Sequence, residues 1–222
     1  MPPQPADPMA EPSVDPSALA AASVEELFAR SGALREGHFL LKSGRHSSRY
    51  LEKFLVLQYP SMASEICRRM AAELSRYDPT LVVGPTTGGV LLAFEVARQL
   101  TALLGREVRG IFAEPVTAPD GSPAGRALRR GWPVATRDRV VLVDDILTTG
   151  ASLVETADAV RSAGVEPLAA AVVVDRSTGD LKLGLLVHAL GRIEIPSWPA
   201  SDCDLCRAGV PLEKPGSSPG PA

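Results

Sequence analysis

The sequence has few cysteines, few aromatic residues, no excess of basic charge and no long apolar run, and each shortage excludes a class of protein. Three cysteines in 222 residues are too few for a disulfide-stabilised scaffold. A net charge of −3 at pH 7 gives no electrostatic reason to expect nucleic-acid or membrane binding. No apolar run approaches the length of a membrane span, and the first residues lack a signal-peptide pattern. We therefore expect a protein of the reducing cytoplasm.

Hydrophobic residues make up 45% of the chain but aromatic residues only 5%, so Val, Leu and Ala must supply most of the core. The length suits one α/β domain with tails. Residues 1–22 are rich in proline, alanine and small polar residues, and residues 214–222 in Pro, Gly and Ser. Neither segment buries enough apolar surface to offset its ordering entropy. We predict disordered tails at 1–22 and 214–222 and a folded domain over 23–213.

The most informative stretch runs from Arg139 to Ser152. Four apolar residues, Val140 to Val143, predict a strand buried on both faces, as in a parallel sheet. Asp144 and Asp145 follow at the point where this strand should surface, and a loop of small and hydroxylated residues leads into a helical pattern.

The two halves of this stretch favour different parts of one ligand. Small residues let backbone N–H groups approach a phosphate, and the helix behind them adds the positive end of its dipole. Carboxylates accept hydrogen bonds from sugar hydroxyls and favour Mg²⁺ nearby. A simple strand–turn–helix in which Asp145 or Thr148 caps the helix is the alternative, but it does not require two adjacent acids.

The stretch resembles the phosphoribosyl-diphosphate (PRPP) binding motif of type I phosphoribosyltransferases. The resemblance implies an α/β fold with a central, mostly parallel sheet flanked by helices and a small N-terminal hood. It implies that Asp144 and Asp145 contact the ribose hydroxyls and that the following loop holds the 5-phosphate. The PRPP-binding residues expected here are Asp144, Asp145, Ile146, Leu147, Thr148, Thr149, Gly150, Ala151 and Ser152. Mg²⁺ is expected near the acidic pair, held mainly by PRPP and water rather than by direct protein ligands.

A second strand, small-residue loop and helix begins at Leu81. Its loop, Gly84-Pro-Thr-Thr-Gly-Gly89, has the form of another anion cradle, because glycine permits close approach of the backbone. In the family the equivalent loop binds the diphosphate of PRPP, which adds Thr86, Thr87 and Gly88 to the predicted site. A plain strand-to-helix turn would explain this unit if it stood alone.

Residues 36–58 are predicted to form the hood, as a short strand, a turn at Ser43-Gly44 and a second strand over 49–57. The run Phe-x-Leu-Lys-Ser-Gly resembles that of orotate phosphoribosyltransferases. The resemblance implies that Lys42 faces the orotate or diphosphate side of the site and that Tyr50 matches a position where an aromatic ring flanks the base. Ser48-Arg49-Tyr50 departs from the Ser-Pro-aromatic that the family often has after this turn.

Residues 114–137 are interrupted by proline and glycine and are predicted to form a mobile lid. Orotate phosphoribosyltransferases carry lysines in this loop, but this chain has none between Lys53 and Lys182. Arg126, Arg129 and Arg130 are the cations available. Arginine binds diphosphate oxygens bidentately but does not readily give up a proton, so any acid role of the lysine does not carry over.

Asp175-Arg176 ends a predicted strand that begins near Pro167. By resemblance Arg176 pairs with the carboxylate of orotate, which favours orotate over a purine, and Thr148 also approaches the base. The resemblance further implies a homodimer and a role in pyrimidine synthesis. Two alternatives stay open: transfer to another base, and a regulator that binds PRPP without transfer. His188, in the last strand, is interpreted as structural.

The C-terminal stretch contains one Cys-x-x-Cys, Cys203 and Cys206. Zinc requires four ligands, and the chain has no second pair of cysteines. Two subunits together would supply four thiolates, and a tight terminal turn without metal is the simpler interpretation. A similar tail occurs in a subset of bacterial orotate phosphoribosyltransferases, which supports the resemblance but gives the cysteines no role.

Overall fold

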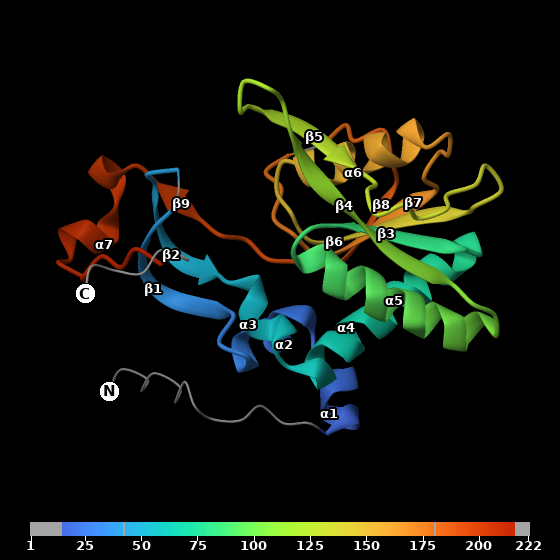
Figure 1. The fold of residues 1–222 in the computed structure, drawn as a ribbon. Coiled ribbons are helices and arrows are strands. Elements are labelled where there is room, and N and C mark those ends of the chain that lie inside the picture. The colour runs from blue at the N-terminus through green and yellow to red at the C-terminus, as the bar shows by residue number, and fades with distance from the viewer. Residues whose placement is uncertain (1–14, 42, 180, 216–222) are drawn as a thin grey trace.

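The computed structural model describes residues 15–41, 43–179 and 181–215 (Figure 1). Lys42 therefore lies outside the described residues, and so does the predicted C-terminal tail apart from Lys214 and Pro215. The helices are α1 (Pro16–Ala21), α2 (Val24–Arg30), α3 (Lys53–Leu57), α4 (Pro60–Leu74), α5 (Gly88–Leu104), α6 (Ala151–Ser162) and α7 (Asp204–Arg207), with 3-10 turns η1 (Ser75–Tyr77) and η2 (Ala200–Asp202). The strands are β1 (Leu34–Leu40), β2 (His46–Leu51), β3 (Leu81–Pro85), β4 (Arg109–Thr117), β5 (Pro123–Ala127), β6 (Val140–Leu147), β7 (Ala169–Asp175), β8 (Val187–Arg192) and β9 (Ser197–Trp198).

The main sheet has the strand order β5-β4-β3-β6-β7-β8. Every neighbouring pair is parallel except β4 and β5. Parallel strands require crossover connections, and helices α5 and α6 supply those after β3 and β6. The predicted central, mostly parallel sheet flanked by helices is confirmed.

Side chains of the central strands alternate between two apolar clusters, one on each face of the sheet. Val141 and Val143 pack into the cluster that includes α4 and α5, while Val140 and Leu142 pack into the cluster that includes α6. All four are fully buried. An apolar run without polar alternation fits this position because helices cover both faces of the strand. Figure 1 shows α4 and α5 below the sheet and α6 above it.

The N-terminal hood is a separate antiparallel sheet of order β1-β2-β9 beside the main sheet (Figure 1). The predicted second strand over 49–57 is wrong beyond Leu51, because α3 begins at Lys53. The Glu52 side chain caps α3 by accepting a hydrogen bond from the Phe54 N–H at 3.3 Å. The short apolar run of residues 54–57 fits a strand or a buried helix equally well, and periodicity alone does not separate the two.

The folded part begins earlier than the predicted tail boundary at residue 22. Helix α1 is capped by the Asp15 side chain and buries Leu19. Ser23 and Glu26 form a capping box at the start of α2. Proline at the first helical position explains the error, since it starts helices as well as marking irregular chain.

The connection predicted as an irregular lid is partly regular. β4 continues to Thr117, and β5 returns antiparallel to it, so the two form an arm that extends from the sheet (Figure 1). Asp120 closes the turn by accepting a hydrogen bond from the Ser122 N–H at 2.9 Å. Residues 128–137 contain no helix or strand. Among the described residues, no helix is long and apolar enough to cross a membrane.

Candidate active site

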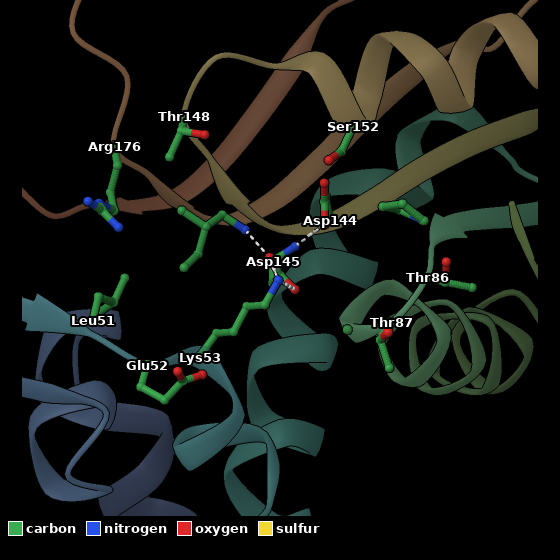
Figure 2. Close-up of a pocket in the computed structure, with 13 residues that line it drawn as sticks. Leu51, Glu52, Lys53, Thr86, Thr87, Asp144, Asp145, Thr148, Ser152 and Arg176 are labelled. Carbon is green, nitrogen blue, oxygen red and sulfur yellow. Dashed lines mark hydrogen bonds and ion pairs between the residues drawn. The ribbon is translucent and has the colours of Figure 1, made fainter. Parts of the chain in front are cut away.

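A cavity of about 320 Å³ lies between the hood and the carboxyl ends of the central strands (Figure 2). Open α/β sheets offer ligand sites at this edge because the loops after parallel strands meet there. The residues around it are Leu51, Glu52, Lys53, Pro85, Thr86, Thr87, Gly88, Asp144, Asp145, Ile146, Thr148, Ser152 and Arg176. Segments that are far apart in the sequence, from Leu51 to Arg176, therefore build one site.

Asp144 and Asp145 lie inside β6 rather than beyond it, because the strand continues to Leu147. The predicted strand end at Val143 is therefore wrong. The two residues are only 6% and 4% exposed. The Asp145 N–H donates to Asp144 Oδ1 at 2.8 Å, and the Ile146 N–H donates to Asp145 Oδ1 at 2.7 Å. These bonds fix both carboxylates at the cavity wall.

Lys53, which the sequence did not single out, is the cation that faces the acidic pair. Its Nζ lies 2.9 Å from Asp145 Oδ1 and 2.8 Å from Oδ2 (Figure 2). Lys53 is the first residue of α3, which follows strand β2 of the hood, and its side chain extends across the cavity to Asp145 in the main sheet. The only sequence signal was its scarcity, since few lysines occur in the chain at all.

The acidic pair is electrostatically unfavourable by itself. Burial, and next the negative charge of Asp145, raise the pKa of Asp144 to about 7. Lys53 and Arg126 oppose this shift with positive charge. Two adjacent buried carboxyls do not ionise together at low cost, so the pair retains a proton near neutral pH unless a ligand donates hydrogen bonds to it.

The loop after β6 forms a second, smaller hollow of about 30 Å³. Every residue from Ile146 to Leu153 lines it. Gly150 precedes α6 with φ of +79°, and no side chain caps the helix. The positive φ favours glycine, and a Cβ at Gly150 would lie 2.3 Å from Leu183 Cδ2, so the Leu183 side chain would have to move. The Ala151 N–H makes only a long hydrogen bond of 3.4 Å to Thr149 Oγ1, so the first turn of α6 can still bind an anion.

The loop after β3 has the same form. Thr87 precedes α5, and no side chain caps this helix either. A Cβ at Gly88 would lie 2.1 Å from Asp145 Oδ2, so glycine at this position lets the start of α5 approach the acidic pair. All predicted PRPP-binding residues from both loops line one or both hollows.

The base-side predictions divide. Arg176 lines the cavity beside Thr148, opposite Leu51 (Figure 2). Burial lowers the pKa of its guanidinium from the usual value, and its Nε has no hydrogen-bond partner among the described residues. Tyr50 stacks on Phe39 with ring centroids 5.6 Å apart and does not line the cavity. It lies close enough to Arg176 for the two groups to influence each other's pKa.

The three arginines of the arm occupy different places. Arg126 is largely buried and donates to Thr86 O and Oγ1 at 3.4 and 3.3 Å, directly behind the α5 loop. Arg130 is exposed and forms an ion pair with Glu114. Arg129 is exposed. None of the three lines the cavity, and Arg126 lies next to it.

The remaining predicted residues lie away from the cavity. His188 accepts or donates a hydrogen bond with the Tyr77 hydroxyl at 2.7 Å, in agreement with a structural role. Cys203 and Cys206 lie at the start of and within α7, at the outer end of the hood (Figure 1).

Comparison with known proteins agrees with this geometry. The family model of the phosphoribosyl transferase domain matches residues 58–183. The orotate phosphoribosyltransferase of Pelotomaculum thermopropionicum is 41% identical over 191 residues, which cover 86% of this chain and 94% of that protein. The crystal structure of the Aeropyrum pernix orotate phosphoribosyltransferase has a TM-score of 0.61 at 26% identity and covers 77% of this chain and 93% of its own. The Mycobacterium tuberculosis enzyme in complex with PRPP has a TM-score of 0.52 at 26% identity and covers 80% and 96%. This chain belongs to the phosphoribosyltransferase family, among the orotate phosphoribosyltransferases.

Proposed function

We propose that the protein transfers the 5-phosphoribosyl group of PRPP to orotate, giving orotidine 5′-phosphate and diphosphate for pyrimidine synthesis. One observation carries the proposal. A single cavity combines a buried acidic pair, the uncapped starts of two helices and a partly buried arginine (Figure 2). These groups match the ribose diol, the two phosphate groups of PRPP and the carboxylate of orotate.

PRPP takes its position from the two helix starts. The hollow of about 30 Å³ at α6 receives the 5-phosphate on backbone N–H groups, with the hydroxyls of Thr148, Thr149 and Ser152 around it. The ribose diol then reaches Asp144 and Asp145, which accept its hydroxyl hydrogen bonds. The diphosphate extends toward the start of α5, where positive charge is available from the helix dipole.

Orotate occupies the end of the cavity at Arg176. Its carboxylate pairs with the guanidinium, whose Nε has no protein partner among the described residues. A charge-assisted bond of this kind is stronger than a neutral one. A purine without a carboxylate would leave the partly buried guanidinium unpaired, and such a mismatch discriminates strongly between bases.

The chemistry needs positioning and charge stabilisation rather than a protein nucleophile. The bond from C1 of the ribose to the diphosphate oxygen breaks, and its electron pair leaves with the diphosphate. N1 of orotate then forms the new bond to C1, and the proton of N1 passes to the released diphosphate. The carboxylates of Asp144 and Asp145 hold the ribose while positive charge develops at C1.

Mg²⁺ forms part of the proposal as an ion held mainly by PRPP oxygens and water. The donors fit this arrangement, since the described residues gather no group of three or more carboxylate, imidazole or thiolate ligands at the acidic pair, and Asp145 already pairs with Lys53. When bound, the ion supplies neutralisation of the diphosphate.

A homodimer and a cytoplasmic location complete the proposal. Leu91 and Phe94 of α5 are 53% and 69% exposed, an apolar surface that suits contact with a second copy. The cytoplasmic location rests on the small number of cysteines in the sequence.

The test is turnover of orotate by the purified protein with PRPP and Mg²⁺, followed by the loss of orotate absorbance. Arg176→Ala is expected to lower kcat/KM for orotate by roughly 30- to 200-fold, equivalent to about 2–3 kcal/mol for a lost charged hydrogen bond. Arg192→Ala is the matched control, because Arg192 also ends a strand but is 58% exposed and pairs with Asp175.

Two results would overturn the proposal. Turnover of hypoxanthine or xanthine, with none of orotate, would favour a different base. PRPP binding with no turnover of any base would favour a regulator that senses PRPP.

A further inference from the structure

Four side chains of the types that bind zinc converge at the outer end of the hood, far from the cavity. They are His38 of β1, His46 at the start of β2, Cys203 and Cys206. Their ligand atoms all lie within 4.8 Å of one another. His38, His46 and Cys203 are buried, and Cys206 is exposed. The sequence separates the pairs by more than 150 residues, and only the fold brings them together.

The distances match the edges of a tetrahedral site. His38 Nε2 lies 3.0 Å from His46 Nδ1, 3.4 Å from Cys203 Sγ and 3.7 Å from Cys206 Sγ. Cys206 Sγ lies 3.2 Å from His46 Nδ1. Zinc bonds of about 2.0–2.1 Å to nitrogen and about 2.3 Å to sulfur give tetrahedral edges of about 3.3–3.8 Å. The four distances above lie within a few tenths of an ångström of these edges. The other two, from Cys203 Sγ to His46 Nδ1 and to Cys206 Sγ, are at most 4.8 Å, so seating an ion requires shifts of up to about an ångström.

The contact of His38 Nδ1 determines which tautomer the neutral imidazole adopts. Nδ1 lies 2.8 Å from the carbonyl oxygen of Val210, which only accepts hydrogen bonds, so Nδ1 carries the proton. Nε2 then presents its lone pair to the cluster. A backbone carbonyl that orients a histidine in this way is typical of metal ligands.

A hydrogen-bond network without metal explains the cluster poorly. The single lone pair of His38 Nε2 faces His46 Nδ1 and both sulfurs, and it can accept one good hydrogen bond. A cation satisfies all four groups together. The two sulfurs and two nitrogens in a tetrahedral arrangement favour zinc over hard cations such as Mg²⁺.

The surroundings also favour a cross-link. Phe39 and Cys203 are buried, yet neither belongs to the two apolar clusters that hold the described part of the chain together. The outer end of the hood buries His38, His46 and Ser47 where a larger domain would bury apolar side chains. Small units with little apolar core commonly take their stability from a bound metal.

We propose that His38 Nε2, His46 Nδ1, Cys203 Sγ and Cys206 Sγ bind one structural Zn²⁺ that fastens the C-terminal segment to the β1–β2 hairpin. Four protein ligands leave no open position, so the ion has no catalytic role. The attachment extends to Glu213, whose N–H donates to His38 O and whose carbonyl accepts from the Leu40 N–H, each at 2.8 Å. The cysteine pair therefore finds its other two ligands in the same chain, and a second subunit is not required.

The first measurement is the zinc content of the purified full chain, by elemental mass spectrometry. About one zinc per chain is expected, and Co²⁺ exchanged into the protein should show tetrahedral and thiolate-to-cobalt absorption bands. Cys206→Ser should lose most of the zinc and the thiolate band intensity. Cys67→Ala is the matched control, because Cys67 is buried in α4 outside the cluster, and this variant should keep its zinc.

The second measurement keeps the test valid if Cys206→Ser does not fold. A strong chelator added to the wild-type protein should lower the unfolding temperature, and Zn²⁺ but not Mg²⁺ should restore it. The proposal is overturned if the wild-type protein contains no zinc and gives no thiolate-to-cobalt band. Full zinc content in Cys206→Ser, or a Cys203–Cys206 disulfide in the freshly purified protein, would also overturn it. None of these measurements depends on transfer activity.

Discussion

Asp144→Asn should stabilise the ligand-free protein at neutral and alkaline pH. Burial and the charge of Asp145 raise the pKa of Asp144 from 3.8 to about 7. The folded state therefore holds a proton that the unfolded chain gives up once the pH exceeds about 4. The contribution of this group is complete below pH 4 and is lost as the pH rises through about 7. Asparagine removes the titration, and its Oδ1 still accepts the hydrogen bond of the Asp145 N–H.

The size of the effect follows from the shift. The pKa of Asp144 differs by about three units between the folded and unfolded states, and each unit corresponds to about 1.4 kcal/mol. The gain in the free energy of unfolding above pH 7 therefore has an upper limit of about 4 kcal/mol. Local rearrangement around the new amide reduces this, so about 2–4 kcal/mol is expected. In a chain of this length that corresponds to a rise of about 5–15 °C in the unfolding temperature.

Urea unfolding at 25 °C and pH 4, 6 and 8 measures the difference. The gain of Asp144→Asn should be near zero at pH 4 and largest at pH 8. Asp138→Asn is the matched control. Burial opposes the ionised form of Asp138, but hydrogen bonds from the Ala135 N–H, Arg109 and Thr80 outweigh it and lower its pKa. This variant should lose stability at pH 8. A gain for Asp144→Asn that is absent at pH 8, or equal at all three pH values, would refute the reasoning.

Three further predictions concern the walls of the cavity. Lys53→Met leaves the buried carboxylate of Asp145 without its ion pair. The free energy of unfolding at pH 8, measured by urea titration, should therefore fall by about 1–3 kcal/mol, a range reduced because the Lys53 side chain is 33% exposed. Lys53→Arg should restore most of this loss. Gly88→Ala places a Cβ 2.1 Å from Asp145 Oδ2 at the start of α5. The affinity for PRPP, measured by calorimetry, should therefore fall at least about tenfold. An unchanged affinity would contradict the proposed position of the diphosphate. Arg126→Ala should raise KM for PRPP about tenfold, because Arg126 lies against the α5 loop. Arg130→Ala should change KM less than about twofold, because Arg130 is exposed. Equal effects of the two variants would contradict this assignment.

The central part of the fold was predictable because its signals are local. An apolar run such as 140–143 must be covered on both faces, and a small-residue loop followed by a helix leaves N–H groups free. Both facts depend only on neighbouring residues. For this reason the strands predicted to begin at Leu81 and Val140, the loops after them and the helices that follow agree with the structure, and the loop residues line the cavity and the hollow beside it.

The sequence failed where the outcome depended on contacts between distant segments. Nothing near Lys53 indicates that its Nζ reaches Asp145, 92 residues away in the sequence. The same holds for His38 and His46, whose positions flanking the hairpin turn acquire meaning only when α7 packs against them. Asp144 and Asp145 were expected at the surface because charged residues usually end a strand, but both are buried, and Lys53 and the start of α5 lie against Asp145.

One strand of the hood, β2, connects the proposed zinc site with the wall of the cavity. β2 starts at His46, in the proposed zinc site, and ends at Leu51, on the cavity wall, with Lys53 two residues further on. At about 3.3 Å per residue, the seven steps from His46 to Lys53 span roughly 20 Å, which is beyond the distance at which a charge in solvent at physiological salt acts directly. A zinc ion would therefore affect the Lys53–Asp145 pair only by holding the strand in place. Since Lys53 is the described cation nearest the acidic pair, the position of β2 sets how much of the charge on Asp145 is neutralised before PRPP arrives.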